Sequence, residues 1–521
     1  MKKLVFSFTD KAIKKLKKPK EILGGKGANL AEMGRLGLPV PPGFTISTAV
    51  CDLFYKNKKQ LPKTILTSIK SELKQIEKIT KKKFGDLNNP LLVSVRSGAR
   101  ISMPGMMDTI LNLGLNDKTV AALKNKTANG RFAKDSYRRF IQMYSNVVLG
   151  VDGHYFEETI DNFKLTKGVL LDTDLNEEDW DDLIKNFKDI VKQKAKIDFP
   201  QNVEEQLYGA ISAVFLSWES QRAKTYRKLN QIPDHWGTAV NVQAMVFGNM
   251  GNDCATGVVF TRNPSDGSKN IYGEYLINAQ GEDVVAGIRT PHPIKKNKKV
   301  EQESLESKFP KAYKEILEIS AKLENHFKEV QDIEFTIENE DIYLLQTRKA
   351  KRTAQASVKI AIDMQKEGIV SKEEALTMVD ANSITNLLHP QFVDSQEKEL
   401  FNKALNASPG AAVGEIVFDA DKAEEEASKG RDVILVRDET SPEDIHGMHS
   451  AVGILTTKGG MTSHAAVVAR GMGKPCVVGA ESLIINNSLK TISNGTTTLN
   501  EGDIISIDGG TGEDYIGEIQ S

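Results

Sequence analysis

Cysteine is scarce in this sequence of 521 residues, which contains only Cys51, Cys254 and Cys476. They lie far apart and in no paired motif, which excludes a disulfide framework and a cysteine-based zinc site and indicates a reducing compartment. The start of the chain also lacks a long hydrophobic run. The apolar run Leu4–Phe8 is too short for a signal peptide or a membrane-spanning helix. We therefore expect a cytoplasmic protein that does not act at a membrane.

The sequence also lacks an excess of charge of either sign, with 69 Lys and Arg against 70 Asp and Glu. Without a net field, nothing draws the chain to nucleic acid or to an anionic membrane. A hydrophobic content of 40% is typical of a globular protein, and the length predicts several domains, each with its own core.

A glycine-rich loop between a strand and a helix carries His464. The apolar run Ala451–Leu455 predicts a buried strand, and Ala465–Met472 predicts a helix that ends before Gly473. His464 would then lie at the helix start, where backbone N–H groups and the helix dipole favour an anion and a neutral imidazole. A histidine there can also be a helix cap or a core residue, but the surrounding loop favours phosphoryl transfer.

The N-terminal half contains two basic residues at places that suit a phosphate. Lys26 follows a glycine turn that opens a helix, and Arg96 lies near the end of the apolar run 91–98, which predicts a buried strand. Met103-Pro104-Gly105 then predicts either a mobile apolar flap or a simple hairpin. Residues 117–231 are predicted to be mostly helical.

A glycine-rich segment follows at residues 239–263. The apolar runs at its two ends predict the strands of one hairpin, with the tip between them. We interpret Gly251, Thr256 and Gly257 as a phosphate loop, because glycines let backbone amides approach phosphate oxygens. A purely structural hairpin tip is the alternative.

Paired polar residues occupy two adjacent predicted strands further along. Asp332 and Glu334 are two residues apart and so face the same side of a strand, as do Gln346 and Arg348 on the next. Two carboxylates facing an arginine suit Mg²⁺ with a triphosphate or a ribose. The alternative is a cross-strand salt bridge.

Together these segments resemble the pyruvate, phosphate dikinase family. The motifs that carry the resemblance are Lys458–Gly473, Ser97–Gly114 and Gly273–Glu282. The resemblance implies an α/β (α+β) fold, with a bilobal ATP-grasp nucleotide-binding region and a swivelling β/β/α phosphohistidine domain on a helical linker. We predict the nucleotide region at 1–348 with a helical insertion about 117–231, the linker at 349–387 and the phosphohistidine domain at 388–521. The family's C-terminal barrel for pyruvate and phosphoenolpyruvate is missing, so we expect a fragment or one half of a split enzyme.

The resemblance also implies roles for single residues. His464 would be the phosphorylated residue and Thr462 a regulatory phosphorylation site. The ATP site, with Mg²⁺ on Asp332 and Glu334, would consist of Lys26, Arg96, Asp332, Glu334, Gln346 and Arg348. His464 would take a pyrophosphoryl group from ATP and release AMP, then pass one phosphoryl group to inorganic phosphate and keep the other for pyruvate. One departure concerns Cys254-Ala255, where the family usually has Ser-Gly.

Other functions stay open at this point. The chain could instead belong to a phosphoenolpyruvate synthase-like enzyme, or to another dikinase of the same plan with a different acceptor. A non-catalytic phosphocarrier would leave the paired acids at 332 and 334 without a role, and a nucleotide-binding scaffold would never turn over. The resemblance also leaves a homodimer open.

Overall fold

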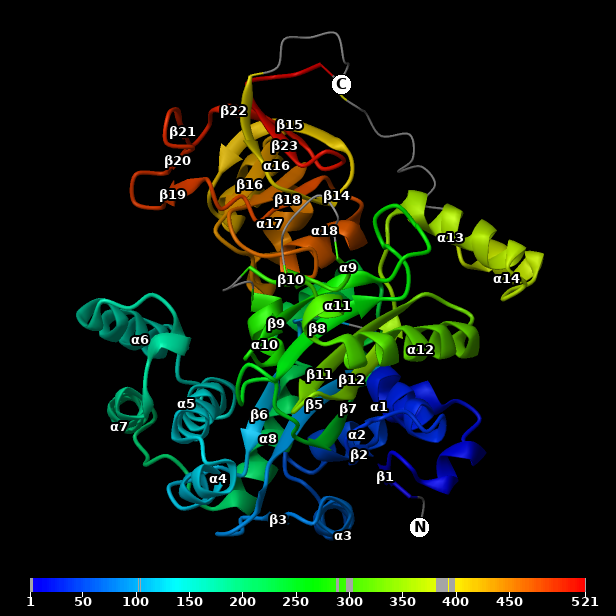
Figure 1. The fold of residues 1–521 in the computed structure, drawn as a ribbon, viewed down its shortest axis with the longest axis vertical. Coiled ribbons are helices and arrows are strands. Elements are labelled where there is room, and N and C mark those ends of the chain that lie inside the picture. The colour runs from blue at the N-terminus through cyan, green and yellow to red at the C-terminus, as the bar shows by residue number, and fades with distance from the viewer. Residues whose placement is uncertain are drawn as a thin grey trace. The chain divides into compact units, whose positions relative to one another are not determined.

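The computed structural model describes residues 3–101, 103, 105–286, 290–296, 303–380, 392 and 399–520. The predicted domain start at 388, the end of the predicted linker and Pro104 of the predicted flap lie outside the described residues. The chain divides into two compact units, Met1–Val246 and Phe247–Ser521, and Figure 1 labels their elements. Within the described part of the chain, no helix combines the length and the apolar character that a bilayer crossing requires.

The first unit is built on a five-stranded sheet of order β1-β2-β7-β5-β6. Its two longest strands, β5 and β7, pair antiparallel and are almost entirely buried. The strands are β1 (Val5–Ser7), β2 (Gly43–Ile46), β5 (Val93–Ala99), β6 (Thr109–Leu113) and β7 (Thr238–Ala244), with a separate pair β3 (Lys83–Phe84) and β4 (Pro90–Leu91). Three helices precede β5 in the chain: α1 (Pro19–Arg35), α2 (Thr48–Lys56) and α3 (Lys63–Thr80).

The predicted helical stretch between β6 and β7 is confirmed. The apolar stripe formed by Leu207, Ala210, Ile211 and Val214 is buried, as its helical spacing predicts. The helices are α4 (Thr119–Thr127), α5 (Gly130–Val147), α6 (His154–Lys167), α7 (Glu177–Ala195), α8 (Val203–Ser217) and α9 (Gln221–Leu229).

The second unit begins with another five-stranded sheet, of order β10-β9-β8-β11-β12. The hairpin predicted for residues 239–263 is wrong, because β7 belongs to the sheet of the first unit and β8 to this one. The strands are β8 (Ala255–Phe260), β9 (Tyr272–Ile277), β10 (His292–Pro293), β11 (Gln331–Glu338) and β12 (Asp341–Lys349), and the helices are α10 (Gly281–Ala286), α11 (Leu305–Lys308) and α12 (Pro310–Phe327).

Two helices follow β12. α13 (Ala354–Lys366) lies within the range predicted for the helical linker. Thr353 caps it by accepting the N–H of Ala356 at 3.1 Å, and Gly368 adopts the left-handed conformation just beyond its end. α14 (Lys372–Thr377) starts at a capping box formed by Ser371 and Glu374.

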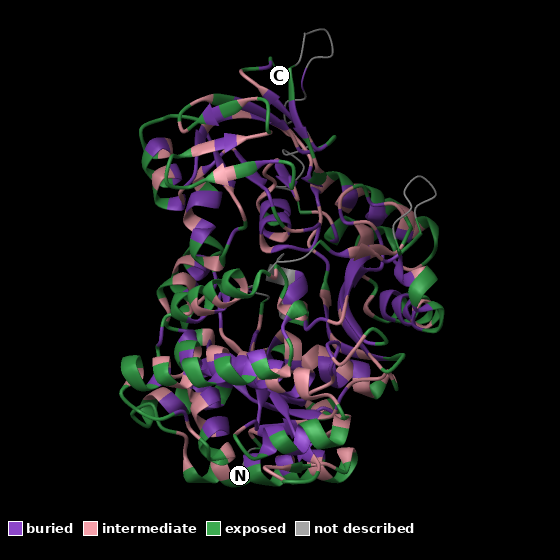
Figure 2. Cartoon of the chain, turned by 60° about the vertical axis from the view of Figure 1, so that its left-hand side comes forward, coloured by how far each residue is buried: buried purple, intermediate pink, exposed green. Residues whose placement is uncertain are grey.

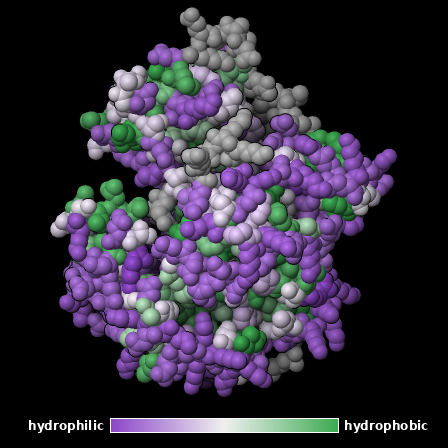
Figure 3. Space-filling model, in the orientation of Figure 1, coloured by the Kyte–Doolittle hydropathy of each residue, from purple (hydrophilic) through white to green (hydrophobic). Residues whose placement is uncertain are grey.

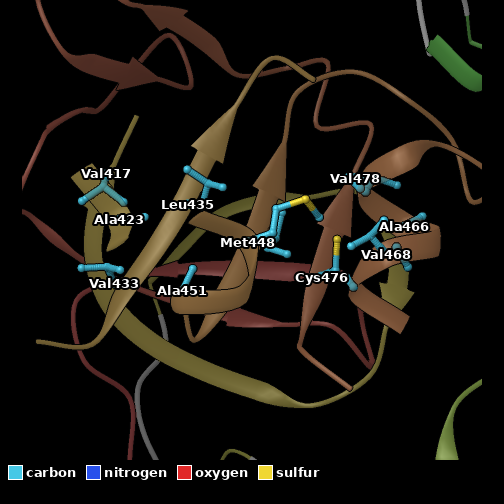
Figure 4. Packing of buried hydrophobic residues seen from close by; sticks show 14 of the residues in the cluster. Val417, Ala423, Val433, Leu435, Met448, Ala451, Ala466, Val468, Cys476 and Val478 are labelled. Atoms are coloured by element: carbon cyan, nitrogen blue, oxygen red, sulfur yellow. The ribbon is translucent and has the colours of Figure 1, made fainter. Parts of the chain in front are cut away.

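An eight-stranded sheet of order β13-β23-β22-β15-β16-β17-β18-β14 forms the rest of the second unit. Four consecutive strands of this sheet, β15 to β18, run parallel to one another. Figure 4 shows the core beneath its helices, where Met448 and Cys476 pack against Ala466 and Val468 of α18. The strands are β13 (Leu400–Lys403), β14 (Leu405–Ser408), β15 (Ala411–Val417), β16 (Val433–Arg437), β17 (Gly453–Thr456), β18 (Cys476–Val478), β22 (Ile504–Asp508) and β23 (Glu513–Ile516); the helices are α16 (Ala420–Ser428), α17 (Ile445–Ser450) and α18 (His464–Met472); and a small sheet holds β19 (Ile484–Asn486), β20 (Thr491–Ser493) and β21 (Thr498–Asn500).

Burial follows this architecture. Figure 2 shows buried residues concentrated along the strands and exposed residues on the outer faces of the helices, and hydrophilic residues cover most of the face drawn in Figure 3. Sheets covered by amphipathic helices confirm the predicted α/β (α+β) class.

Candidate active site

His464 is the first residue of α18, as predicted. Ser463 precedes it as the N-cap and accepts the N–H of Ala466 at 3.4 Å, while the left-handed Gly473 ends the helix. The apolar residues of α18 anchor the helix on the sheet (Figure 4). The imidazole is therefore held at the positive end of a helix that is fixed by packing.

The two ring nitrogens of His464 have different surroundings. Nδ1 lies 3.0 Å from the hydroxyl of Thr440, whereas Nε2 is buried and makes no hydrogen bond to a described residue. Burial lowers the pKa of His464 to about 4, with a contribution from the positive charge of Lys351 and against the nearby Asp444 and Glu443. At neutral pH the ring is uncharged, and in the tautomer that donates its Nδ1–H to Thr440, Nε2 has a free lone pair for attack on phosphorus.

The β11–β12 hairpin brings together the four polar residues predicted for it. Asp332 lies directly opposite Arg348, and Glu334 lies opposite Gln346. The Nε atom of Arg348 is 2.6 Å from Oδ2 of Asp332, and the side-chain amide of Gln346 donates to Glu334 at 3.0 Å. Burial raises the pKa of Asp332 and Arg348 opposes that rise. The cross-strand salt bridge given above as the alternative is present, and it still leaves Oδ1 of Asp332 buried without a hydrogen-bond partner among the described residues.

The register of the sheet extends this polar cluster sideways. Glu274 on β9 lies opposite Val258 on β8, and Val258 lies opposite Glu334 on β11. Directly opposed residues of antiparallel strands point to the same face. With strands about 4.8 Å apart, Glu274 is about 10 Å from Glu334 along one row of that face.

The loop before His464 contacts this row. Glu274 accepts the backbone N–H groups of Met461 at 3.0 Å and of Thr462 at 3.4 Å, and the Thr462 hydroxyl at 3.1 Å. The guanidinium of Arg470, from α18, lies 5.8 Å from the ring centre of Phe260 on β8. Phe260 is directly opposite Asp332. The histidine loop thus rests on the sheet face that carries the hairpin acids.

Lys26 and Arg96 belong to the first unit, whereas the other candidate residues belong to the second. Lys26 lies in α1, and Arg96 is a buried residue of β5. At Gly24, where α1 kinks with a φ of 67°, an added Cβ would overlap the carbonyl oxygen of Gly98 on β5. Glycine therefore lets the turn before Lys26 approach the strand that carries Arg96.

The predicted phosphate-loop residues are not all in a loop. Gly251 lies in a turn, where its carbonyl accepts the N–H of Cys254 at 3.2 Å, but Thr256 and Gly257 are buried residues of β8. The Thr256 hydroxyl donates to the Phe335 carbonyl at 3.1 Å. The loop placement of these two residues is therefore wrong, and a phosphate contact for all three stays a prediction.

Sequence reasoning missed four residues around His464: Thr440, Lys351, Glu274 and Arg470. Glu274 and Arg470 lie inside the motifs already singled out, but no spacing rule marks either as a contact. Thr440 follows β16 and precedes Ser441-Pro442, a helix-start signature that fixes a turn there. Partial burial, with the neighbouring Arg348, lowers the pKa of Lys351 to about 8, and nothing in the sequence indicates that this lysine is partly buried.

Comparison with known proteins matches two domains to these regions. The AMP/ATP-binding domain of pyruvate phosphate dikinase matches residues 20–83, 57–314 and 295–369, and the mobile domain of PEP-utilising enzymes matches residues 430–512. Fold and site thus define a protein that joins a nucleotide-binding domain to a mobile histidine domain.

Curated relatives narrow this class. The chain is 53% identical to pyruvate, phosphate dikinase of Rhizobium meliloti over 523 residues, which cover 100% of this chain and 58% of the relative. It is 55% identical to that of Clostridium symbiosum, covering 96% and 57%, and 51% identical to the chloroplastic protein of Mesembryanthemum crystallinum, covering 99% and 54%. The chain belongs to the pyruvate, phosphate dikinase family. It spans about half the length of these relatives.

Proposed function

We propose that this chain transfers two linked phosphoryl groups from ATP to His464. One of them passes to inorganic phosphate, and the histidine carries the other to pyruvate. One observation supports this most directly: the loop that presents the unpartnered Nε2 of His464 is hydrogen-bonded to the sheet that bears Asp332 and Arg348. A nucleophile and a set of phosphate ligands therefore share one unit of the protein.

In the first step Nε2 of His464 attacks the β-phosphorus of ATP. An N–P bond forms, the bond from that phosphorus to the AMP oxygen breaks, and AMP leaves. Arg348 stabilises the negative charge on the transferring group, and Lys26 and Arg96 bind the remaining phosphates. All six residues predicted for the ATP site are part of this proposal. They are Lys26, Arg96, Asp332, Glu334, Gln346 and Arg348.

In the second step inorganic phosphate attacks the terminal phosphorus of the pyrophosphohistidine. The P–O–P bond breaks, pyrophosphate leaves, and a single phosphoryl group stays on Nε2. Transfer of that group to pyruvate, giving phosphoenolpyruvate, is the third step and takes place at a site other than the two sheets described above. The homodimer stays a prediction, and we place the protein in the cytoplasm, where its three buried free cysteines would stay reduced.

Asp332 and Glu334 are the residues that would hold Mg²⁺ with ATP. The buried, unpartnered Oδ1 of Asp332 fits a cation ligand. Among the described residues no group of three or more potential ligands occurs, which suits a metal that takes one or two carboxylates and completes its shell with phosphate oxygens and water. When bound, Mg²⁺ neutralises charge on the phosphate oxygens.

Thr462 is proposed as a regulatory phosphorylation site. Its hydroxyl is buried and donates to Glu274. A phosphate dianion on that oxygen would meet the Glu274 carboxylate, and the like charges would repel the histidine loop from the sheet.

Isotope position tests the proposed reaction. Protein is incubated with ATP labelled at the β- or the γ-phosphate, with and without inorganic phosphate. Without phosphate, both labels should enter acid-labile linkage in equal amounts, and with phosphate only the β-label should stay. His464→Ala should take no label. His446→Ala is a matched control, because His446 lies in the same domain but contacts Asp421 at the surface. Label from the γ-position alone would overturn the proposal.

A further inference from the structure

Glu274 makes the contact that joins the histidine loop to the five-stranded sheet. Its two carboxylate oxygens accept three hydrogen bonds from Met461 and Thr462, residues 187 and 188 positions away in the chain. All three side chains are buried. The three hydrogen bonds therefore form a specific contact between the histidine loop and the five-stranded sheet, which we call the seat.

This carboxylate depends on the loop for its partners. It takes part in no ion pair of 4 Å or less with a described residue, and burial raises its pKa while the donors of Met461 and Thr462 oppose that rise. A buried carboxylate needs hydrogen bonds to stay ionised. When the loop leaves the sheet, both the carboxylate and the loop amides can be hydrated instead, so the contact is reversible.

Gly460 packs directly against the Glu274 carboxylate. A Cβ at residue 460 would lie 2.8 Å from Oε1 and 2.9 Å from Cδ of Glu274, and closer still to Oε2. Gly460 is not among the glycines with a positive φ, so its backbone conformation is open to other residues. The glycine is needed for the approach of Glu274, and alanine at this position would act on that contact alone.

Arg470 holds the same loop from its other side. Its Nη2 donates to the Met461 carbonyl, while Glu274 accepts the Met461 N–H. The guanidinium lies over Phe260, which is opposite Asp332 in the register. Met461 is thus fixed at both polar backbone atoms, one by each of the two packed parts.

We propose that Glu274 is a positioning residue that seats the histidine loop beside the ATP ligands, and that its release frees the loop to leave. The inference rests on the proposed transfer from ATP to His464. Glu274 acts through Met461 and Thr462, so its loss should slow phosphorylation of His464 without weakening ATP binding. A nucleotide ligand would show the opposite split.

The first test is Glu274→Gln, which keeps the size of the side chain but turns an N–H₂ group toward the loop donors. Single-turnover labelling of His464 by β-labelled ATP should slow on the order of 10- to 100-fold, because charged hydrogen bonds are lost. The Kd for ATP should stay unchanged. Glu481→Gln is the matched control: Glu481 accepts a hydrogen bond from Thr290 in an exposed contact, and its loss should leave labelling near the wild-type rate.

Gly460 supplies an independent arm. Gly460→Ala should slow labelling to a similar degree, because its methyl group displaces the carboxylate. In Glu274→Ala the opposing atoms are gone, so adding Gly460→Ala should cause no further loss. Additive losses in the double variant would overturn the inference, as would wild-type labelling in Glu274→Gln or a fall in ATP affinity that matches the fall in rate.

Hydrogen exchange separates this inference from the proposed function. In wild-type protein the amides of Met461 and Thr462 should be protected, and Glu274→Gln should raise exchange in the peptide 457–463 while leaving α16 unchanged. This readout needs no phosphoryl transfer. Absence of label in the wild type would sink the proposed function, whereas unchanged exchange in the variant would sink the seat.

Discussion

The two large sheets of the second unit differ in how completely their buried charged groups are paired. In the five-stranded sheet and the helices beside it, Asp332, Glu324 and Glu367 have arginine partners from that same part, whereas Glu274 takes its partners from the histidine loop. Arg262 is fully buried and lies 2.6 Å from Glu324 and 2.8 Å from Glu367. Asp332 has Arg348 at 2.6 Å. These three acids therefore have their counter-charges within this part of the chain.

The eight-stranded sheet holds charged and titratable groups that are only partly matched. Asp514 accepts one hydrogen bond, from Asn402 at 2.8 Å, and its Oδ1 has no partner among the described residues. Arg470 donates through Nη2, but its Nε and Nη1 are buried without a described partner. His464 has the same kind of unpartnered atom at Nε2.

The difference teaches where the missing partners come from. Burial lowers the pKa of Arg470, and the carboxylates among the groups that oppose this are Glu274 and Asp332, both on the five-stranded sheet. A buried polar group without a partner destabilises a fold. The histidine-bearing part therefore depends on contacts from outside its own sheet, which suits a carrier that binds and leaves, while the five-stranded sheet suits a fixed platform.

Arg348→Ala should break the matched side of this comparison most strongly. It removes the guanidinium proposed to stabilise the transferring group and leaves Asp332 buried without its arginine. We expect single-turnover labelling of His464 to fall by about 10²–10³-fold, the usual loss for one preorganised charge donor. Arg348→Lys keeps the charge but lacks the planar guanidinium, so its labelling rate should lie between those of wild type and Arg348→Ala. Equal rates for Arg348→Ala and wild type would assign the charge stabilisation elsewhere.

Arg262→Met tests whether the matched charges of the platform are structural. The variant leaves Glu324 and Glu367 without the arginine between them. Removing one partner of a buried ion pair costs about 3–5 kcal/mol, so the free energy of unfolding should fall by that order in urea titrations. Arg437→Met is the control, because Arg437 lies 3.5 Å from Asp444 and its own side chain is partly exposed. A loss no larger than that of the control would contradict the structural role.

Asp514→Asn tests the unmatched side through pH. Burial raises the pKa of Asp514 to about 7, against an ordinary value of 3.8. Between these pH values the folded protein binds the extra proton, so wild-type stability should fall as pH rises through this window. The asparagine variant lacks this term and should gain about 2–4 kcal/mol relative to wild type between pH 4 and 8. Parallel stability curves for the two proteins would show that Asp514 is ionised throughout.

The sequence alone predicts the parts of the site that depend on periodicity. Alternation along two strands places Asp332 beside Glu334 and Gln346 beside Arg348, and helix-start signals place His464 at the beginning of α18. Alternation does not determine which strand a given strand pairs with. The segment at 239–263 therefore predicts one hairpin, although its two strands belong to different sheets. Contacts such as Glu274 to Thr462 join residues 188 positions apart through single polar atoms, and no local pattern records them.

Thr440→Val should have the smallest of these effects, because it removes one hydrogen bond from the unmatched side and leaves the fold intact. The Thr440 hydroxyl lies 3.0 Å from Nδ1 of His464 and orients the ring so that Nε2 is the free nitrogen. Valine has nearly the same shape, so only this orientation is lost. A net hydrogen bond of about 1.4 kcal/mol corresponds to a tenfold slower labelling of His464. Thr440→Ser keeps the hydroxyl and should restore most of the rate. If the valine variant labels as fast as wild type, packing alone orients the imidazole.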